Sequence, residues 1–194
     1  MRSIVFPRVW AAVMLGCLPL LVLLLVPQLM RSRAGSESLL MVGVAALLVV
    51  LAAAVVLAPV MSAFRAPVER TWQPRTALAA TRRVWRTRRG QAWLALGLFA
   101  VVYAAGQIAG YALGAVVPYV YDNPAFPGDP AASPWVIDYP AYALQAAVIY
   151  LVTTLGLAVY AARLRALALA GPVGAADEER HTAAPGLEAV DRIA

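Results

Sequence analysis

Long runs of apolar residues alternate with short polar segments along this chain. Four of these runs contain no charged residue, and each reaches the about 20 residues that an α-helix needs to cross the hydrocarbon core of a bilayer. We therefore expect an all-α, polytopic membrane protein whose four transmembrane helices form two hairpins. The predicted spans are residues 9–30, 39–64, 91–117 and 141–162.

Prolines interrupt the first of these runs. Pro19 lies near its middle and is expected to kink the helix, and Pro27 is expected to weaken its last turn, because proline donates no backbone hydrogen bond. Met1, Arg2 and Arg8 precede the run, as in a signal peptide. However, the run is long enough to span and no convincing cleavage site follows it, so we expect an uncleaved first helix.

A basic segment, residues 65–90, separates the two predicted hairpins. It holds eight of the sixteen basic residues of the chain, all of them arginine. Pro74 suits a first helical turn, and the periodicity predicts an amphipathic helix over residues 74–89 that lies along the membrane interface. Arg88 falls on its apolar side, and we expect its long stem to reach water. Residues expected to contact anionic lipid or a partner are Arg75, Arg82, Arg86, Arg89 and Trp85. The segment is either a simple anchor or a dedicated docking surface.

The distribution of arginine predicts the orientation of the chain. Short segments rich in arginine stay on the cytoplasmic side of a membrane. With both termini in the cytoplasm, fourteen arginines lie inside and only Arg31 and Arg33 lie outside. We expect a multi-pass protein of a bacterial inner (plasma) membrane, with a membrane domain over residues 1–170 and a flexible cytoplasmic tail over residues 171–194.

Three glycines in the third run are spaced by four residues. Gly106, Gly110 and Gly114 lie on one face of the predicted helix, and such spacing allows two helix backbones to approach closely in lipid. Gln107 lies beside this face and is expected to donate or accept a hydrogen bond across the contact. The partner is either the fourth helix of the same chain or a second copy.

The loop over residues 118–140 lies outside the membrane in this arrangement. It is rich in proline and aromatic residues and carries Asp122, Asp129 and Asp138 but no basic residue. Three carboxylates attract cations, but their spacing matches no calcium or zinc loop. We expect no metal site there and no cofactor elsewhere.

Composition and missing motifs narrow the classes of function. The chain is 62% hydrophobic with a mean hydropathy of +0.74, and its net charge of +6 comes from arginines beside the spans. That placement favours anionic headgroups over nucleic acid as partners. No predicted span has an ionisable residue at its centre, which argues against a proton-coupled carrier. Cys17 is the only cysteine, and no phosphate-binding loop, histidine pair or Ser-His pair is present, so we expect no catalytic residue.

The segment ALAATRRVWRTRRGQAWLALGLF, residues 77–99, resembles a group of bacterial polytopic membrane proteins. These are similar to the membrane domain attached to some glycerophosphoryl diester phosphodiesterases, in which helical hairpins alternate with an amphipathic segment bearing arginine and tryptophan. The resemblance covers about residues 58–165 and includes no phosphodiesterase domain. It therefore implies a membrane scaffold and no catalytic residue.

The sequence therefore predicts a non-enzymatic integral membrane protein that serves as a scaffold or accessory subunit of a larger membrane or export assembly. One alternative is a small oligomeric transporter or channel subunit that uses the glycine face and the kinked first helix. A further alternative is an interfacial lipid-modifying enzyme that uses the aspartates of the outer loop.

Overall fold

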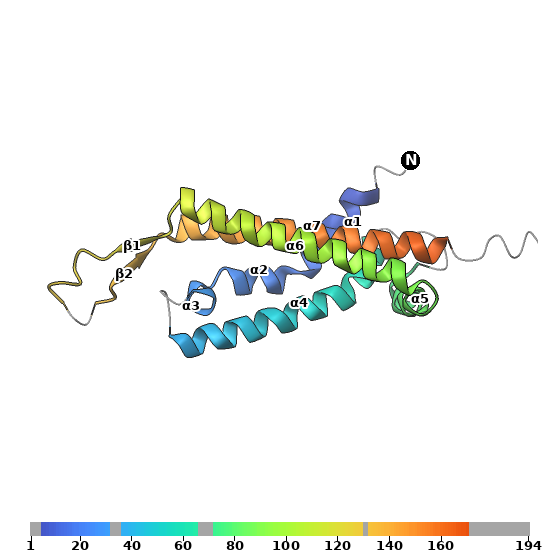
Figure 1. The fold of residues 1–194 in the computed structure, drawn as a ribbon, viewed down its shortest axis with the longest axis horizontal. Coiled ribbons are helices and arrows are strands. Elements are labelled where there is room, and N and C mark those ends of the chain that lie inside the picture. Colours follow the sequence, from blue (N-terminus) through green and yellow to red (C-terminus); the bar gives the residue numbers. More distant parts are fainter. Residues whose placement is uncertain (1–4, 32–35, 66–71, 130–131, 171–194) are drawn as a thin grey trace, which may run out of the picture.

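The computed structural model describes residues 5–31, 36–65, 72–129 and 132–170, and these residues are mostly helical (Figure 1). The predicted tail over residues 171–194 and part of the basic segment, residues 66–71, lie outside the described residues. The elements are α1 Val5–Gly16, α2 Leu18–Leu24, α3 Pro27–Met30, α4 Glu37–Arg65, α5 Pro74–Thr87, α6 Arg89–Val116, β1 Val120–Asp122, β2 Trp135–Ile137 and α7 Tyr139–Leu169.

Three long helices have the length and apolar character needed to cross a membrane. They cover Glu37–Phe64, Arg89–Val116 and Tyr139–Leu169 within the described part of the chain. A fourth candidate is the pair Phe6–Gly16 and Leu18–Leu24, which is bent by 56°. The prediction of a helical protein with several apolar spans is confirmed, whereas four crossings in two hairpins stay a prediction.

The first apolar run is broken into three helices instead of one kinked helix over residues 9–30. Cys17 leaves helical geometry between α1 and α2, and Val26 takes an extended conformation before α3. Pro19 and Pro27 each lie in the first two positions of the helix that follows a break. Proline is well tolerated there because those positions have no intrahelical acceptor for an N–H group. The expected effect of both prolines is therefore present, and it is stronger than a kink.

Helix α4 is tied at its end to the start of α5 through a buried indole. The hydroxyl of Ser62 donates to the carbonyl of Pro59 (2.7 Å), and the indole N–H of Trp72 donates to the Ser62 hydroxyl (3.3 Å). Trp72 is completely buried. Its indole therefore packs inside the protein and satisfies its N–H there, as buried tryptophan requires.

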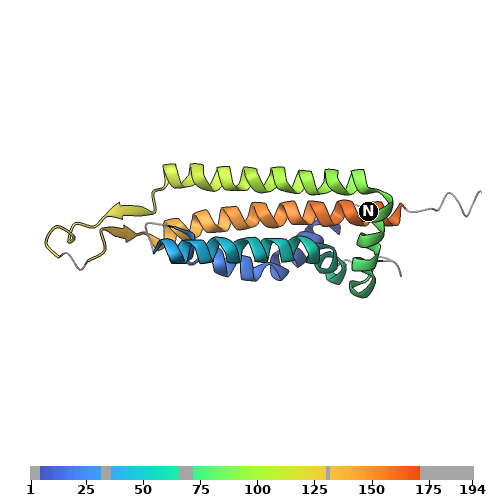
Figure 2. The ribbon, with the colours of Figure 1, turned by 60° about the horizontal axis from the view of Figure 1, so that its bottom comes forward.

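Helix α5 lies across the ends of the long helices, as Figure 2 shows. Pro74 is its first residue, and Gln73 and Thr76 form a capping box that satisfies backbone groups at its start. The helix ends at Thr87, and Arg89 already begins α6. The predicted helix over residues 74–89 is thus correct except at its last turn, because the chain bends at Arg88.

The segment expected to be a loop, residues 118–140, contains a small antiparallel hairpin. Strands β1 and β2 pair Val120 with Ile137 and Asp122 with Trp135. The carboxamide of Asn123 donates to the Ser133 carbonyl (2.6 Å), which closes the far end of the hairpin. Figures 1 and 2 show it projecting beyond the helices at the end opposite α5.

Helix α7 is the centre of the molecule. It packs against α1, α2, α4, α5 and α6. In its most apolar window 56% of the residues are buried inside the protein, compared with 11% for α4 and 22% for α6. Helices α4 and α6 therefore offer most of their apolar surface to the surroundings, which suits contact with lipid tails.

Candidate functional site

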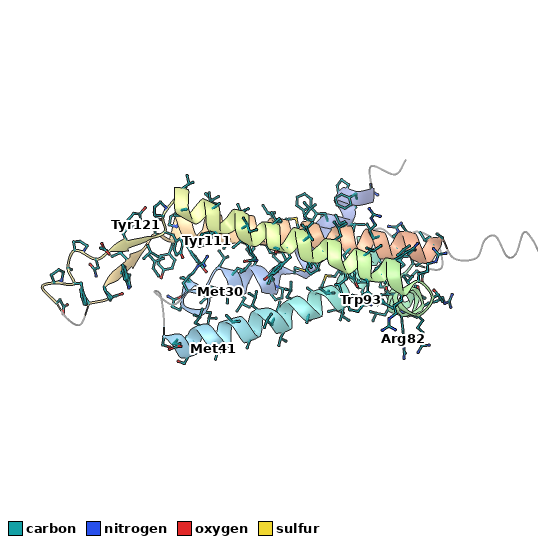
Figure 3. All side chains as sticks on the ribbon, in the orientation of Figure 1. Met30, Met41, Arg82, Trp93, Tyr111 and Tyr121 are labelled. Carbon is teal, nitrogen blue, oxygen red and sulfur yellow. The ribbon has the colours of Figure 1, made fainter. Side chains whose placement is uncertain are left out.

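The arginine face of α5, defined here as Arg75, Arg82, Arg83 and Arg86, is exposed at one end of the molecule. On the opposite side of α5, Ala77 and Val84 are buried. Figure 3 shows Arg82 pointing away from the long helices. The pattern follows from the helical period, since the residues between the arginines pack against α4 and α7.

Two arginines beside this face lie elsewhere than the sequence predicted. Arg89 is exposed but belongs to α6. Arg88 does not extend freely into water: its Nη2 donates to the carbonyl of Ala170 (2.6 Å) at the end of α7. Cations are favourable at a helix C-terminus, where carbonyl groups lack partners. Arg88 therefore fixes the bend between α5 and α6 to the end of α7.

Trp85 is half-buried and packs within the protein. Its ring meets Trp93 edge to face, with centroids 5.4 Å apart. Trp93 itself is 55% exposed on α6. Of the five residues predicted to contact lipid or a partner, Trp85 is the one whose side chain is already engaged inside the fold.

The three spaced glycines of α6 lie along α7. A Cβ atom added to Gly106 would meet Val152 at 2.9 Å, and one added to Gly110 would meet Ile149 at 2.5 Å. Gly114 lies against the carboxamide of Gln145. The hydrogen bond expected from Gln107 is made instead from α7, where Nε2 of Gln145 donates to the Gly110 carbonyl (2.7 Å).

Side chains of α7 and α1 connect the broken first run to the rest of the protein. The hydroxyl of Tyr142 donates to the Leu24 carbonyl (2.6 Å), and the hydroxyl of Tyr150 donates to the Met14 carbonyl. The indole of Trp10 donates to the Thr154 hydroxyl (3.2 Å). A helix break removes backbone donors from the carbonyls that precede it, and tyrosine hydroxyls of α7 donate to two such carbonyls; the Met14 carbonyl also accepts the Cys17 N–H (3.2 Å). Pro19 and Pro27 indicate in the sequence that some backbone carbonyls of this run need donors from elsewhere. They do not indicate which residues supply those donors.

The outer cleft lies at the end of the molecule opposite α5, and no pattern in the sequence indicates it. Its volume is about 530 Å³, and its walls include Met30, Arg31, Leu40, Ala115, Tyr119 and Gln145. Met30 and Tyr111, another lining residue, are labelled at this end in Figure 3. The guanidinium carbon of Arg31 lies 5.2 Å from the centre of the Tyr119 ring. Arg31 is thus a cation in a cleft wall, held by an aromatic face.

The three aspartates of the outer segment occupy different structural positions and do not act together. Asp138 caps α7, because its carboxylate accepts the Ala141 N–H (3.2 Å), and Asp122 lies in β1. Asp129 follows the turn at the tip of the hairpin. Within the described ranges, no three histidine, cysteine or acidic side chains come together as metal ligands would.

Comparisons with protein-family models, with curated proteins and with solved structures find no match for this chain. The resemblance of residues 77–99 to membrane domains of phosphodiesterases therefore stays a prediction. The structural features that bear on its function are the arginine face, the broken first run and the outer cleft.

Proposed function

We propose that this protein is a non-enzymatic scaffold or accessory subunit of a larger membrane or export assembly in a bacterial inner membrane. It crosses the membrane four times as two hairpins, counting α1 and α2 as one broken span, and both termini lie in the cytoplasm. Helix α5 lies at the cytoplasmic surface between the hairpins.

Charge supports this orientation. The arginine face of α5 and Arg163 near the end of α7 belong to one end of the molecule, which also holds the start of α1 (Figure 1). The hairpin at the other end carries aspartates and no basic residue. Positively charged segments are retained in the cytoplasm during insertion, so the end with α5 is the cytoplasmic end.

The exposed arginine face is the observation on which the scaffold role rests. The packing of α5 uses its apolar side, where Ala77 and Val84 are buried, whereas its four arginines are exposed. Guanidinium groups form paired hydrogen bonds with carboxylates, and they are common in protein interfaces. An acidic surface on a cytoplasmic or membrane partner therefore fits this face.

Co-purification tests the proposal. Wild-type protein and the Arg82→Gln/Arg86→Gln variant would be isolated in mild detergent and their bound proteins quantified by mass spectrometry. We expect a defined partner to be recovered with the wild type and to fall by about tenfold with the double variant, since two charge-assisted contacts are lost. The Arg82→Lys/Arg86→Lys variant keeps the charge and serves as the matched control. Recovery of the same proteins with all three forms, or of none with the wild type, contradicts the scaffold role.

One observation favours a second function, a small transporter or channel subunit. Discontinuous membrane helices often line substrate sites, because a broken helix exposes backbone groups. The bend of 56° between α1 and α2 is such a break. A single copy encloses little water, so this function requires an oligomer, and native mass spectrometry that detects monomer alone would exclude it.

A further inference from the structure

The outer cleft has the features of a small binding site at the depth of lipid headgroups. It lies between the end of α3, the first turn of α4, the last turns of α6 and the start of α7. Its volume of about 530 Å³ falls within the range of pockets that hold small ligands. The cleft is at the end of the apolar helices, where a bilayer would present phosphate groups.

Arg31 supplies the charge in this cleft. The structure gives it no carboxylate partner among the described residues; its contact is the face of the Tyr119 ring. Its Nε atom is buried without a hydrogen-bond acceptor. An unpaired guanidinium beside an apolar wall favours an anion, and its fork of N–H groups matches the oxygens of a phosphate.

Gln145 supplies an acceptor. The residue is 3% exposed, and its Nε2 is held by the Gly110 carbonyl, which fixes the direction of the carboxamide. The remaining atom, Oε1, is buried without a donor. A buried acceptor without a partner is costly, so a ligand group that donates a hydrogen bond gains binding energy here. Both residues already line the cleft, so a ligand bound there lies beside them.

We propose that the outer cleft binds a phosphate ester that carries a hydrogen-bond donor, with the phosphate on Arg31 and the donor on Gln145. An ammonium or hydroxyl group a few bonds from the phosphate satisfies this description. Such an ester is available in two forms, as the headgroup of a phospholipid such as phosphatidylethanolamine or as a free molecule such as phosphoethanolamine. The apolar side chains of Met30, Leu40 and Ala115 in the walls suit the glycerol and upper acyl region of the lipid form.

Titration of the delipidated full-length protein, followed by native mass spectrometry, tests the site. Phosphatidylethanolamine is compared with phosphatidylcholine, which has the same phosphate but no donor in its headgroup. We expect wild-type protein to prefer phosphatidylethanolamine by about tenfold. Arg31→Gln should weaken binding of both lipids by about tenfold or more, and Gln145→Met should remove the preference while leaving binding of phosphatidylcholine unchanged.

Controls separate the cleft from general attraction to headgroups. Arg163→Gln removes the same charge from an exposed position at the opposite end and should leave both affinities unchanged. Ala115→Phe fills the cleft from an exposed position of α6 with Arg31 intact, and it should also abolish the preference, even if Arg31→Gln fails to fold. Soluble phosphoethanolamine and phosphocholine, titrated in the same way, identify the free ester as ligand if phosphoethanolamine binds and the lipid headgroup if it does not.

Equal binding of phosphatidylethanolamine and phosphatidylcholine by the wild type overturns the proposal, unless phosphoethanolamine alone binds in a manner sensitive to Arg31→Gln. Loss of affinity with Arg163→Gln as large as with Arg31→Gln also overturns it, because the lipids would then be held by charge anywhere on the surface.

Discussion

At the scale of single residues, Gly43 has the strictest requirement for the absence of a side chain. A Cβ atom there would collide with the backbone carbonyl of Leu29, which cannot move as the tip of a side chain can. By contrast, the atoms opposite Gly106 and Gly110 belong to the side chains of Val152 and Ile149. Gly106 and Gly110 stood out in the sequence because their spacing is regular. Gly43 is alone in its run, so its role depends on a contact with α3 that no local pattern reveals.

The alanine variant of Gly43 tests this contact. Gly43→Ala is expected to lower the free energy of unfolding by about 1–3 kcal/mol, because overpacking against backbone forces α3 and α4 apart. Thermal unfolding in detergent measures it. Gly97→Ala is the matched control, since nothing lies within 4 Å of a Cβ there and alanine favours helix. Equal melting temperatures for the two variants would show that the α3–α4 contact is not close.

The cleft shows why site residues were harder to predict than helices. The exposure of Arg75, Arg82 and Arg86 follows from helical periodicity and could be predicted. For Arg31 the sequence predicts only that it is one of two arginines outside the membrane. It does not predict the contact with Tyr119, because the two residues are far apart in sequence. Gln145 was one polar residue in an apolar run. Its role follows from its hydrogen bond to the Gly110 carbonyl. Because every residue has a backbone carbonyl, the sequence does not indicate which one Gln145 contacts.

At the scale of elements, the lengths of the apolar runs predict the long helices well, and α4 continues through Pro59 without a break. Helix α4 covers Glu37–Arg65 against a prediction of 39–64, and α6 covers Arg89–Val116 against 91–117. Helix α7 continues past the predicted span over residues 141–162 to Leu169, in agreement with a helix expected to run on through Ala170 until Gly171 and Pro172 end it. The first run and the hairpin were described less well. Breaks and short strands depend on tertiary partners, and tertiary partners are not visible in hydropathy.

The broken first run yields a prediction at this scale. Tyr142→Phe removes the donor to the Leu24 carbonyl and should cost about 1–2 kcal/mol of stability. Hydrogen exchange should increase most in α2 and α3. Tyr121→Phe is the control, because its hydroxyl donates to the exposed Pro118 carbonyl, which water can satisfy instead. If α2 and α3 exchange equally fast in both variants, α2 is held by its apolar packing alone.

At the scale of the whole molecule, the two ends differ in charge, and the proposed orientation follows from that difference. A Cys17→Ser background allows single cysteines to be placed at Thr87 on α5 and Ala125 in the turn of the hairpin, both exposed. A maleimide that cannot cross membranes should label Ala125→Cys in intact spheroplasts and Thr87→Cys only after permeabilisation. The reverse pattern would place the arginine face outside and would contradict the scaffold proposal, while the chemistry of the outer cleft would remain open to its own test.

The central position of α7 has a consequence for how the protein is made. Helix α7 is synthesised after the six other helices that the structure describes, yet five of them pack against it and its tyrosines hold the backbone of the first run. Until residue 139 and those after it have entered the bilayer, the earlier segments lack the surface on which they assemble. The nascent chain therefore remains incompletely folded, in contact with lipid or with the insertion machinery, until α7 is inserted. A protein truncated anywhere before α7 should be degraded by the cell.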